Sequence, residues 1–489
     1  MAETPIAEDA SGQILQKTAR GLFWNFIAYG LSKGIVLVTT SILARLLGKD
    51  DFGLVALAVV AINYLSVIKD MGLGMALIQR RGDVKKAADT VFTLNLIFGI
   101  FLSAILIPIA PGVAAYFKNP MVTPVLRWLG LTFFIGALGS VHMVWLMREL
   151  DYRRKLIPDM GSALIKGFVS IGLALAGYGV WALVFGQLAG VLSSVTLFWI
   201  IVPWRPRFTL DPKITKSLLN FGFSIISSDI LDVTINNLSY IIIGRLYGAV
   251  QLGVYTLAYR LPEMLLIGNL WIMANVTFPA FANIQESSDN MRRGFLGAVR
   301  LVELIAIPIC LGLIIAAEPI VLVAFGDQWL DAIPVLRVLA LYALVASVGY
   351  HVGDVYKAIG RPDILLRMTI LTLVLMAPAL WVGSRYGLLG VAWAYVVAVS
   401  IERGISLVIA TRIIDVSIMD ILAQLLPSLK GGLVMALTTL LALYWTTDIN
   451  LFARLAVIVL TGVVSYLGVL WWTERENLLQ LFRLIRKPS

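Results

Sequence analysis

The stretch ARLLGKDDFGLVALA, from Ala44 to Ala58, recurs two hundred residues later as GRLYGAVQLGVYTLA, from Gly244 to Ala258. The two copies align without a gap and share six residues, two of them glycines. Each copy lies between two long apolar runs, which predicts a short turn that joins two helices. A single match could arise by chance in an apolar chain, so a repeat needs further matches in the same order.

Composition indicates an integral membrane protein. Of the 489 residues, 59% are hydrophobic and 14% are charged, whereas soluble domains carry about 25% charged residues. A soluble fold could not bury so much apolar surface, and no long polar stretch remains for a separate soluble domain. The single cysteine, Cys310, excludes an intramolecular disulfide. The polar character of the first twenty residues predicts no removable signal peptide.

Apolar runs of about 20 residues, the length that crosses a bilayer core, predict an all-α polytopic membrane protein. We expect fourteen transmembrane helices, because the runs are too long and lack the alternation of barrel strands. Their predicted ranges are 21–45, 52–79, 88–116, 121–147, 156–176, 179–202, 215–245, 250–281, 295–317, 333–357, 363–383, 387–411, 428–446 and 452–473.

Basic residues predict the orientation of these helices. With a cytoplasmic amino terminus, 26 of the 39 Lys and Arg residues fall in inner loops and tails, eight fall outside and five lie within helices. Cytoplasmic loops carry such an excess, so both termini are predicted to be cytoplasmic. The same distribution explains the net charge of +10 without nucleic acid as a partner. We therefore expect a multi-pass membrane protein.

Two further matches establish the repeat. PVLRWLGL, from Pro124 to Leu131, pairs with PVLRVLAL, from Pro334 to Leu341, and the dipeptide Tyr-Gly at 178 recurs at 386. Three matches in order, at offsets of 200 to 210, predict an internal duplication. Each unit holds six helices, an even number, so both enter the membrane in the same direction and a pseudo-two-fold axis along the membrane normal relates them. The predicted parts are a tail at 1–20, an N-lobe at 21–204, a C-lobe at 205–412, and two appended helices with a second tail at 413–489.

Polar side chains recur at helical spacing in the four helices that the repeated turn joins. Such residues inside a membrane face a cavity or one another, and we predict that these line a central cavity. The set comprises Asn25, Tyr29 and Lys33 in the first helix, Asn63, Lys69 and Asp70 in the second, Asp229, Asp232 and Asn236 in the seventh, and Arg260 and Glu263 in the eighth. The alternative is that Arg260 with Glu263, or Lys33 with Asp229, form structural ion pairs.

Four other charged residues lie in helices outside this set, and we expect them to be structural: Lys166, Glu303, Glu402 and Arg403. Asp354, near the inner end of the tenth helix, has no predicted role. His142 and His351 each stand alone among apolar neighbours, so no metal site is expected. GKDDFG, which begins at Gly48, lacks the Gly-Lys-Ser/Thr ending of a phosphate loop, and no ATPase motif or catalytic residue is predicted.

The motifs together resemble a known family. ILARLLGKDDFGLVALA from Ile42, DMGLGMALIQRR from Asp70 and IIIGRLYGAVQLGVYTLAYRLPEM from Ile241 are similar to the bacterial polysaccharide exporters, the Wzx-type flippases. These belong to the multidrug/oligosaccharidyl-lipid/polysaccharide superfamily, and the branch that exports colanic acid, succinoglycan or teichuronic acid repeat units is the most similar. The resemblance covers nearly the whole chain and both six-helix lobes.

The resemblance implies a two-lobe transporter that works by alternating access. It would lie in the bacterial cytoplasmic membrane and flip an oligosaccharide repeat unit on an undecaprenyl diphosphate carrier across it for exopolysaccharide, capsule or O-antigen synthesis. The diphosphate needs cationic partners, and Lys33, Lys69 and Arg260 are available for that role. No cofactor is implied, and whether the acidic residues bind coupling H⁺ or Na⁺ stays open. Membrane lipids, a polysaccharide polymerase and chain-length proteins are the partners that the resemblance suggests.

Two other functions compete with this interpretation. A multidrug or cation-coupled antiporter of the same superfamily would usually have twelve helices and an acidic site, whereas this sequence predicts fourteen helices and mixed charge. A membrane glycan polymerase or ligase would need a large outer loop with catalytic groups. The longest predicted outer loop, near Glu318 to Ala332, has about fifteen residues, which disfavours an enzyme.

Overall fold

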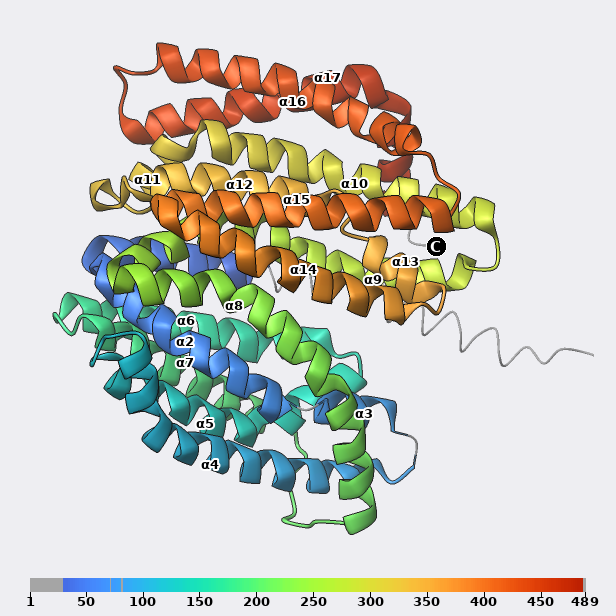
Figure 1. The fold of residues 1–489 in the computed structure, drawn as a ribbon. Helices are drawn as coiled ribbons and strands as arrows, with labels where there is room; N and C mark the ends of the chain where they lie inside the picture. The colour runs from blue at the N-terminus through green and yellow to red at the C-terminus, as the bar shows by residue number, and fades with distance from the viewer. Residues whose placement is uncertain (1–29, 71, 81, 487–489) are drawn as a thin grey trace, which may run out of the picture. The chain divides into compact units, whose positions relative to one another are not determined.

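The computed structural model describes the backbone of residues 30–70, 72–80 and 82–486. Side chains are described in these ranges except at 70, 219–225, 227–228, 271–272, 275–276 and 476–486. The described chain is built mainly from α-helices, as the sequence predicts (Figure 1). It divides into two compact units, Met1–Gly253 and Val254–Ser489. The predicted lobe boundaries at residues 204 and 412 stay predictions.

The first unit holds a helical segment at 30–46 and the helices that follow it. In this unit α4 packs against α5, α6 against α7, and α5 against α7. The helices are α2 (Lys49–Asp70), α3 (Leu73–Gln79), α4 (Val84–Tyr116), α5 (Val122–Arg148), α6 (Tyr152–Leu175), α7 (Val180–Ile201) and most of α8 (Pro212–Pro262).

The second unit repeats this order of helix pairs. Here α10 packs against α12, α14 against α15, and α12 against α15, while α16 and α17 pack on each other and on α10 and α11. Its elements after α8 are the π-helix η1 (Glu263–Ile267), α9 (Gly268–Ile284), α10 (Ser288–Ile315), α11 (Ala317–Ala324), the 3₁₀-helix η2 (Asp327–Trp329), α12 (Ala332–Ser347), α13 (Val352–Ala358), α14 (Pro362–Gly383), the 3₁₀-helix η3 (Ser384–Tyr386), α15 (Gly387–Ile413), α16 (Ile418–Trp445) and α17 (Leu451–Arg486).

The repeated sequence motifs make the same contacts in each unit. In PVLRWLGL, Arg127 Nε donates to the carbonyl oxygen of Ile107 at 3.1 Å, and in PVLRVLAL, Arg337 Nε donates to that of Ile314 at 3.2 Å. Each arginine therefore joins the start of its own helix, α5 or α12, to an earlier helix of the same unit, α4 or α10. The Tyr-Gly pairs also match, because Gly179 and Gly387 both have positive φ, at 51° and 78°. A left-handed backbone there favours glycine, which has no Cβ.

The second copy of the opening motif forms a turn inside α8. Gly248 has φ 78° and ψ −172°, which interrupts the helical geometry between the predicted seventh and eighth helices. The sequence therefore predicts this boundary correctly, although the hydrogen-bonded turns continue through it.

Within the first unit, the first copy of the opening motif lies against the part of the second copy that ends at Gly253. A Cβ on Gly53 would overlap the carbonyl oxygen of Ala249, and a Cβ on Gly253 would overlap that of Lys49. The amide nitrogen of Gly53 also lies close to Gly253. The matching glycines thus form a reciprocal backbone crossing, in which each copy supplies the glycine that the other copy packs against.

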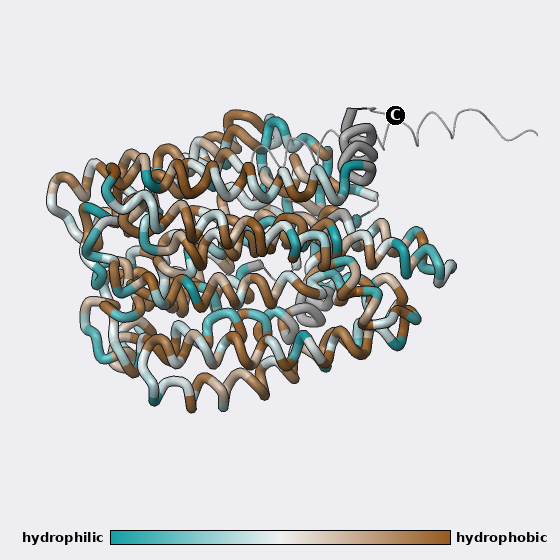
Figure 2. Tube along the Cα trace, turned by 90° about the horizontal axis from the view of Figure 1, so that it is seen from above, coloured by the Kyte–Doolittle hydropathy of each residue, from teal (hydrophilic) through white to brown (hydrophobic). Residues whose placement is uncertain are grey.

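Eleven segments of the described chain are long and apolar enough to cross a membrane. One of them, Pro362–Ile413, covers both α14 and α15, and another, Asp229–Leu270, runs through the turn at Gly248. The count of fourteen stays a prediction, although the expected ranges 363–383 and 387–411 agree with α14 and α15 within two residues. Apolar residues follow the helices along most of their length, with hydrophilic residues more frequent near the ends (Figure 2).

Large apolar side chains also cover the outer faces of these helices. Phe168, Ile200 and Val464 are each more than two-thirds exposed, at 71%, 71% and 68%. Water would not support so much exposed apolar surface, whereas lipid would. At the end of α16, Trp445 is 77% exposed, a position typical of an aromatic anchor at the membrane interface. The described chain is therefore a multi-pass membrane protein.

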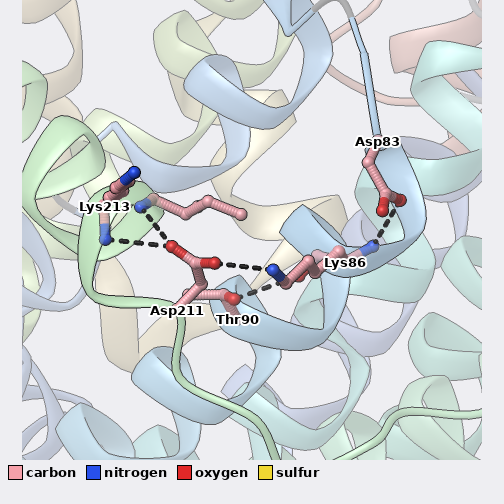
Figure 3. A network of polar contacts seen from close by, with 6 residues as sticks. Asp83, Lys86, Thr90, Asp211 and Lys213 are labelled. Atoms are coloured by element: carbon pink, nitrogen blue, oxygen red, sulfur yellow. Dashed lines mark hydrogen bonds and ion pairs between the residues drawn. The ribbon is translucent and has the colours of Figure 1, made fainter.

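Asp211 begins α8 and ties it to the start of α4 (Figure 3). Its Oδ1 accepts hydrogen bonds from the amide nitrogens of Lys213 and Ile214 at 2.9 and 3.0 Å, and its Oδ2 lies 2.7 Å from Lys86 Nζ. Asp83 caps α4 in the same way, accepting from the amide nitrogen of Lys86 at 3.1 Å. The contact with Lys86 is the largest cause that lowers the pKa of Asp211 from 3.8 to about 2, and the hydrogen bonds from the amides of α8 lower it further.

Replacing Asp211 with alanine should lower the melting temperature of the purified protein in detergent at pH 7, because α8 loses its N-cap and Lys86 loses its partner. Since the folded pKa is depressed, this stabilisation is fully present above pH 3.8 and is lost as the pH falls towards about 2. The difference in melting temperature should therefore be constant between pH 7 and pH 5 and should narrow below pH 4. A difference that disappears between pH 7 and pH 5 would contradict this assignment. Asp289→Ala, at a site whose side chain is 83% exposed, is the control.

Candidate functional site

The polar stripes of α2 and α8 meet in the first unit. Asn63 Nδ2 donates to Asn237 Oδ1 at 3.0 Å, and the Tyr64 hydroxyl donates to Thr234 Oγ1 at 3.3 Å. Asn237 is 6% exposed, so its amide is held in the packed interface between the two helices. Asn236, the residue predicted from the sequence, is exposed and donates to the carbonyl oxygen of Asp232 at 2.8 Å.

The remaining predicted residues of this unit that the structure describes lie on the helical segment 30–46, on α2 and on α8. Lys33, Lys69 and Asp229 are half-buried, and Asp232 is exposed. Asn25 and Tyr29 lie outside the described residues, and so does the side chain of Asp70, whose backbone ends α2. The structure therefore brings Asn63 together with α8, while the roles of the predicted residues stay predictions.

Arg260 and Glu263 lie where α8 gives way to the π-helix η1. Arg260 Nη1 is 3.3 Å from Glu263 Oε2, and both side chains are about one-third exposed, at 32% and 33%. Pro262 between them supplies no amide proton, and a π-helix often marks a functional site. A row of aromatic rings adjoins this turn, because Tyr259 packs on Tyr342 and Tyr342 on Tyr395, with centroid distances of 6.2 and 4.5 Å.

The chemistry of this pair suits an anionic ligand with exposed oxygens. A guanidinium carries five N–H donors in a planar fork, and one carboxylate occupies at most two of them. Arg260 can therefore hold a phosphate oxygen pair in the bidentate geometry that arginine favours while Glu263 fixes its orientation. The contact also fits a structural ion pair, and a double replacement separates the two roles.

The residues expected to be structural divide into two groups. Lys166 Nζ donates to Gln187 Oε1 at 2.5 Å, and Glu303 Oε1 accepts from the Ser347 hydroxyl at 2.9 Å. Each of these contacts joins neighbouring helices, α6 to α7 and α10 to α12, as a structural role requires. Glu402 and Arg403, in contrast, line a cavity of about 380 Å³ in the second unit together with Asp354.

Sequence reasoning missed the interface residues of α8 and the cavity in the second unit. Asn237 follows directly after the predicted Asn236, and one residue turns a helix by about 100°, so a stripe alone cannot show which of two adjacent amides faces α2. The cavity had a sequence signal, because Tyr350, Asp354 and Lys357 are spaced by four and three residues. That spacing equals the one used to predict the other stripes.

Comparison with known proteins places the chain among polysaccharide biosynthesis proteins. Teichuronic acid biosynthesis protein TuaB of Bacillus subtilis (strain 168) is 28% identical over 338 residues, 68% of this chain and 70% of that protein. Succinoglycan biosynthesis transport protein ExoT of Rhizobium meliloti (strain 1021) is 25% identical over 479 residues, 96% of this chain and 95% of that protein.

A solved structure supports the fold independently. Lipid II flippase MurJ in an inward closed conformation superposes with a TM-score of 0.73 at 16% sequence identity, over 92% of this chain and 99% of that one. At this identity the likeness concerns the fold. The family described as polysaccharide biosynthesis protein matches residues 42–334, which is more than half of the 489 residues. The chain therefore belongs to the polysaccharide biosynthesis protein family.

Proposed function

We propose that this protein flips an oligosaccharide repeat unit, linked to undecaprenyl diphosphate, from the cytoplasmic to the outer leaflet of the cytoplasmic membrane. The observation that carries the proposal is the match over 96% of the chain to a succinoglycan biosynthesis transport protein. The family match and the superposition on a lipid II flippase support it. A protein built almost wholly from membrane-crossing helices is suited to moving a lipid-linked substrate.

The proposed mechanism assigns the anionic part of the substrate to basic residues on the central helices. The diphosphate would leave water on entering the protein, and a buried anion needs paired, hydrogen-bonding cations. Lys33, Lys69 and Arg260 are proposed for this role because each lies on one of the four helices that carry polar stripes. Alternating access of the two lobes would then expose the site to one side of the membrane at a time, with both chain termini cytoplasmic.

The competing functions have less support. The relatives are named for polysaccharide biosynthesis or its transport step, whereas a multidrug antiporter would act on unrelated cations. The segment predicted as the longest outer loop is folded into the short helices α11 (Ala317–Ala324) and η2 (Asp327–Trp329). Val321, Phe325 and Trp329 in this segment are buried, so it is a packed connection and is poorly suited to form the catalytic loop of a polymerase.

Deletion of the gene in its native host tests the proposal. Loss of a flippase should abolish surface polysaccharide and cause its undecaprenyl-diphosphate-linked repeat unit to accumulate, and mass spectrometry of the extracted lipids would identify the sugars. Re-expression of the wild-type protein should reverse both effects. Normal export by the deletion strain, with no accumulated lipid-linked intermediate, would refute the proposed function.

A further inference from the structure

The cavity of the second unit lies beside a break in the tenth predicted helix. The helix ends as α12 at Ser347 and resumes as α13 at Val352, and Gly349 in the break has φ 72°. Helices α9, α13, α14 and α15 supply the rest of its walls, and its volume is about 380 Å³. Volumes of about 300–1,000 Å³ are typical of small-molecule sites, so this space is large enough for a ligand.

The walls carry two carboxylates, two cations and aromatic rings. Asp354 and Glu402 supply the carboxylates, and Lys357 and Arg403 supply the cations. The two acidic side chains are each 6% exposed, whereas those of Lys357 and Arg403 are 47% and 30% exposed. The buried acceptors and the more accessible donors therefore present opposite charges around one space, with a formal sum of zero.

The aromatic walls belong to Tyr350 in the break and Phe278 on α9. Rings beside charged groups offer a flat apolar face to a ligand whose other atoms need hydrogen bonds. Such a combination of polar edge and apolar face is the arrangement that a small polar ring requires.

Hydrogen bonds of His351 hold Asp354 in position. Asp354 Oδ2 lies 3.0 Å from His351 Nδ1, which also lies 3.0 Å from Thr277 Oγ1 on α9. The Thr277 hydroxyl donates its proton to the carbonyl oxygen of Met273 at 2.7 Å. Toward His351, Thr277 Oγ1 can therefore act only as an acceptor. We therefore assign the proton to His351 Nδ1, which faces two acceptors. His351 thus links Asp354 on α13 to Thr277 on α9.

A second contact joins two helices that line the cavity, α13 and α15. The Tyr356 hydroxyl donates to the carbonyl oxygen of Ser406 at 2.7 Å, which joins α13 to α15. Glu402 Oε2 lies 3.4 Å from Arg403 Nε, so the second acid lies next to a cation of its own helix. A site whose walls are already fixed loses less entropy when a ligand binds.

The charges select the chemical class of the ligand. A phosphate would meet Asp354 and Glu402, and a metal cation or ammonium would meet Lys357 and Arg403, so like-charge repulsion disfavours both. An apolar ligand would strip water from four charged groups without replacing their hydrogen bonds. A neutral ring with several hydroxyls satisfies all four, because each hydroxyl donates to a carboxylate and accepts from a cation, while its apolar face lies against an aromatic ring.

We propose that this cavity is a sugar subsite that binds a monosaccharide of the substrate headgroup. The proposal rests on the proposed function, because it assumes an oligosaccharide substrate. It separates two tasks: basic residues such as Arg260 hold the diphosphate that is common to all repeat units, and the cavity recognises the sugars. The π-helix that begins at Glu263 packs against α12, the helix that leads into the break, so the two regions belong to one packed unit.

The test compares binding of two lipids by purified full-length protein in nanodiscs. The probes are undecaprenyl diphosphate alone and the lipid-linked repeat unit extracted from the deletion strain. Asp354→Asn and Glu402→Gln each remove one charged acceptor at nearly constant volume. A hydrogen bond to a charged group contributes about 1.5–3 kcal/mol, or roughly 10- to 150-fold in affinity. Each variant should therefore bind the lipid-linked repeat unit at least about tenfold more weakly and bind the bare carrier unchanged.

Glu303→Gln is the matched control, because Glu303 is another buried carboxylate of the same unit that bonds to Ser347 outside the cavity. It should change neither affinity. Unchanged affinity for the repeat unit in both cavity variants would overturn the sugar subsite, and so would an equal loss for both lipids, which would indicate a structural role. Failure of the proposed function would differ, since the deletion strain would then accumulate no lipid-linked repeat unit.

Discussion

Replacing Gly53 or Gly253 with alanine is expected to destabilise the protein and to reduce polysaccharide export sharply. A Cβ at either position would overlap a backbone carbonyl oxygen of the other copy of the motif, that of Ala249 or Lys49. A backbone atom cannot move aside as a flexible side chain can, so the two helices would have to separate. Overpacking of this kind costs about 1–3 kcal/mol, and sometimes more. Thermal unfolding in detergent and export in the complemented deletion strain measure the two effects.

Gly136 and Gly297 supply the controls, since they lie within α5 and α10 and a Cβ on either would meet no atom within 4 Å. Alanine at these positions should leave stability unchanged or raise it, because glycine in a helix interior is destabilising by about 0.5–1 kcal/mol relative to alanine. If Gly53→Ala and Gly253→Ala behaved like these controls, the reciprocal crossing would not contribute to stability.

Replacing Arg260 or Lys33 with alanine should abolish surface polysaccharide while the protein stays in the membrane at normal abundance. The proposed reason is the loss of a charge-assisted hydrogen bond to the diphosphate, which contributes about 1.5–3 kcal/mol and hence roughly 10- to 150-fold in binding. Surface polysaccharide and membrane abundance should be measured in the same complemented cells. Arg292→Ala is the control, because Arg292 pairs with Asp420 at 2.8 Å away from the predicted set.

Double replacements separate substrate binding from structural pairing. If Arg260 serves only to neutralise Glu263, which lies 3.3 Å away, the variant Arg260→Ala with Glu263→Ala should regain export. If Arg260 binds the diphosphate, the double variant should stay inactive. Exchange of Lys33 and Asp229 applies the same logic to the first unit: restored export in the swapped variant would identify that pair as structural. Full export by both single alanine variants would refute the cationic site.

Much of the fold could be predicted from the sequence, because lipid imposes a simple rule on helix length. The ranges expected for α14 and α15 agree with the structure, and the glycine at 248 falls at the predicted boundary between two helices. The PVLR motifs also pointed to equivalent positions, which the matching contacts of Arg127 and Arg337 confirm. Repeated residues were informative because the duplicated units reuse the same local geometry.

The site was harder to predict, because helical spacing shows which residues share a face without showing what that face meets. Asn236 and Asn237 are adjacent, and packing against α2 selects Asn237. The opening motif predicts a turn, whereas two of its shared glycines, Gly53 and Gly253, are sites of close backbone approach between the two copies. The cavity at Asp354 depends on a helix break at Gly349 and on three other helices, and a local pattern cannot reveal such a convergence.

The most direct test of the central claim is the movement of the lipid-linked repeat unit in proteoliposomes. Repeat unit extracted from the deletion strain would be placed in both leaflets, and an oxidant that cannot cross the membrane would modify only the sugars that reach the outside. With wild-type protein we predict that the whole pool becomes modified, and with Arg260→Ala that modification stops at the outer-leaflet pool, as in protein-free vesicles. If modification in vesicles with wild-type protein also stops at the outer-leaflet pool, that result would contradict the proposed flipping.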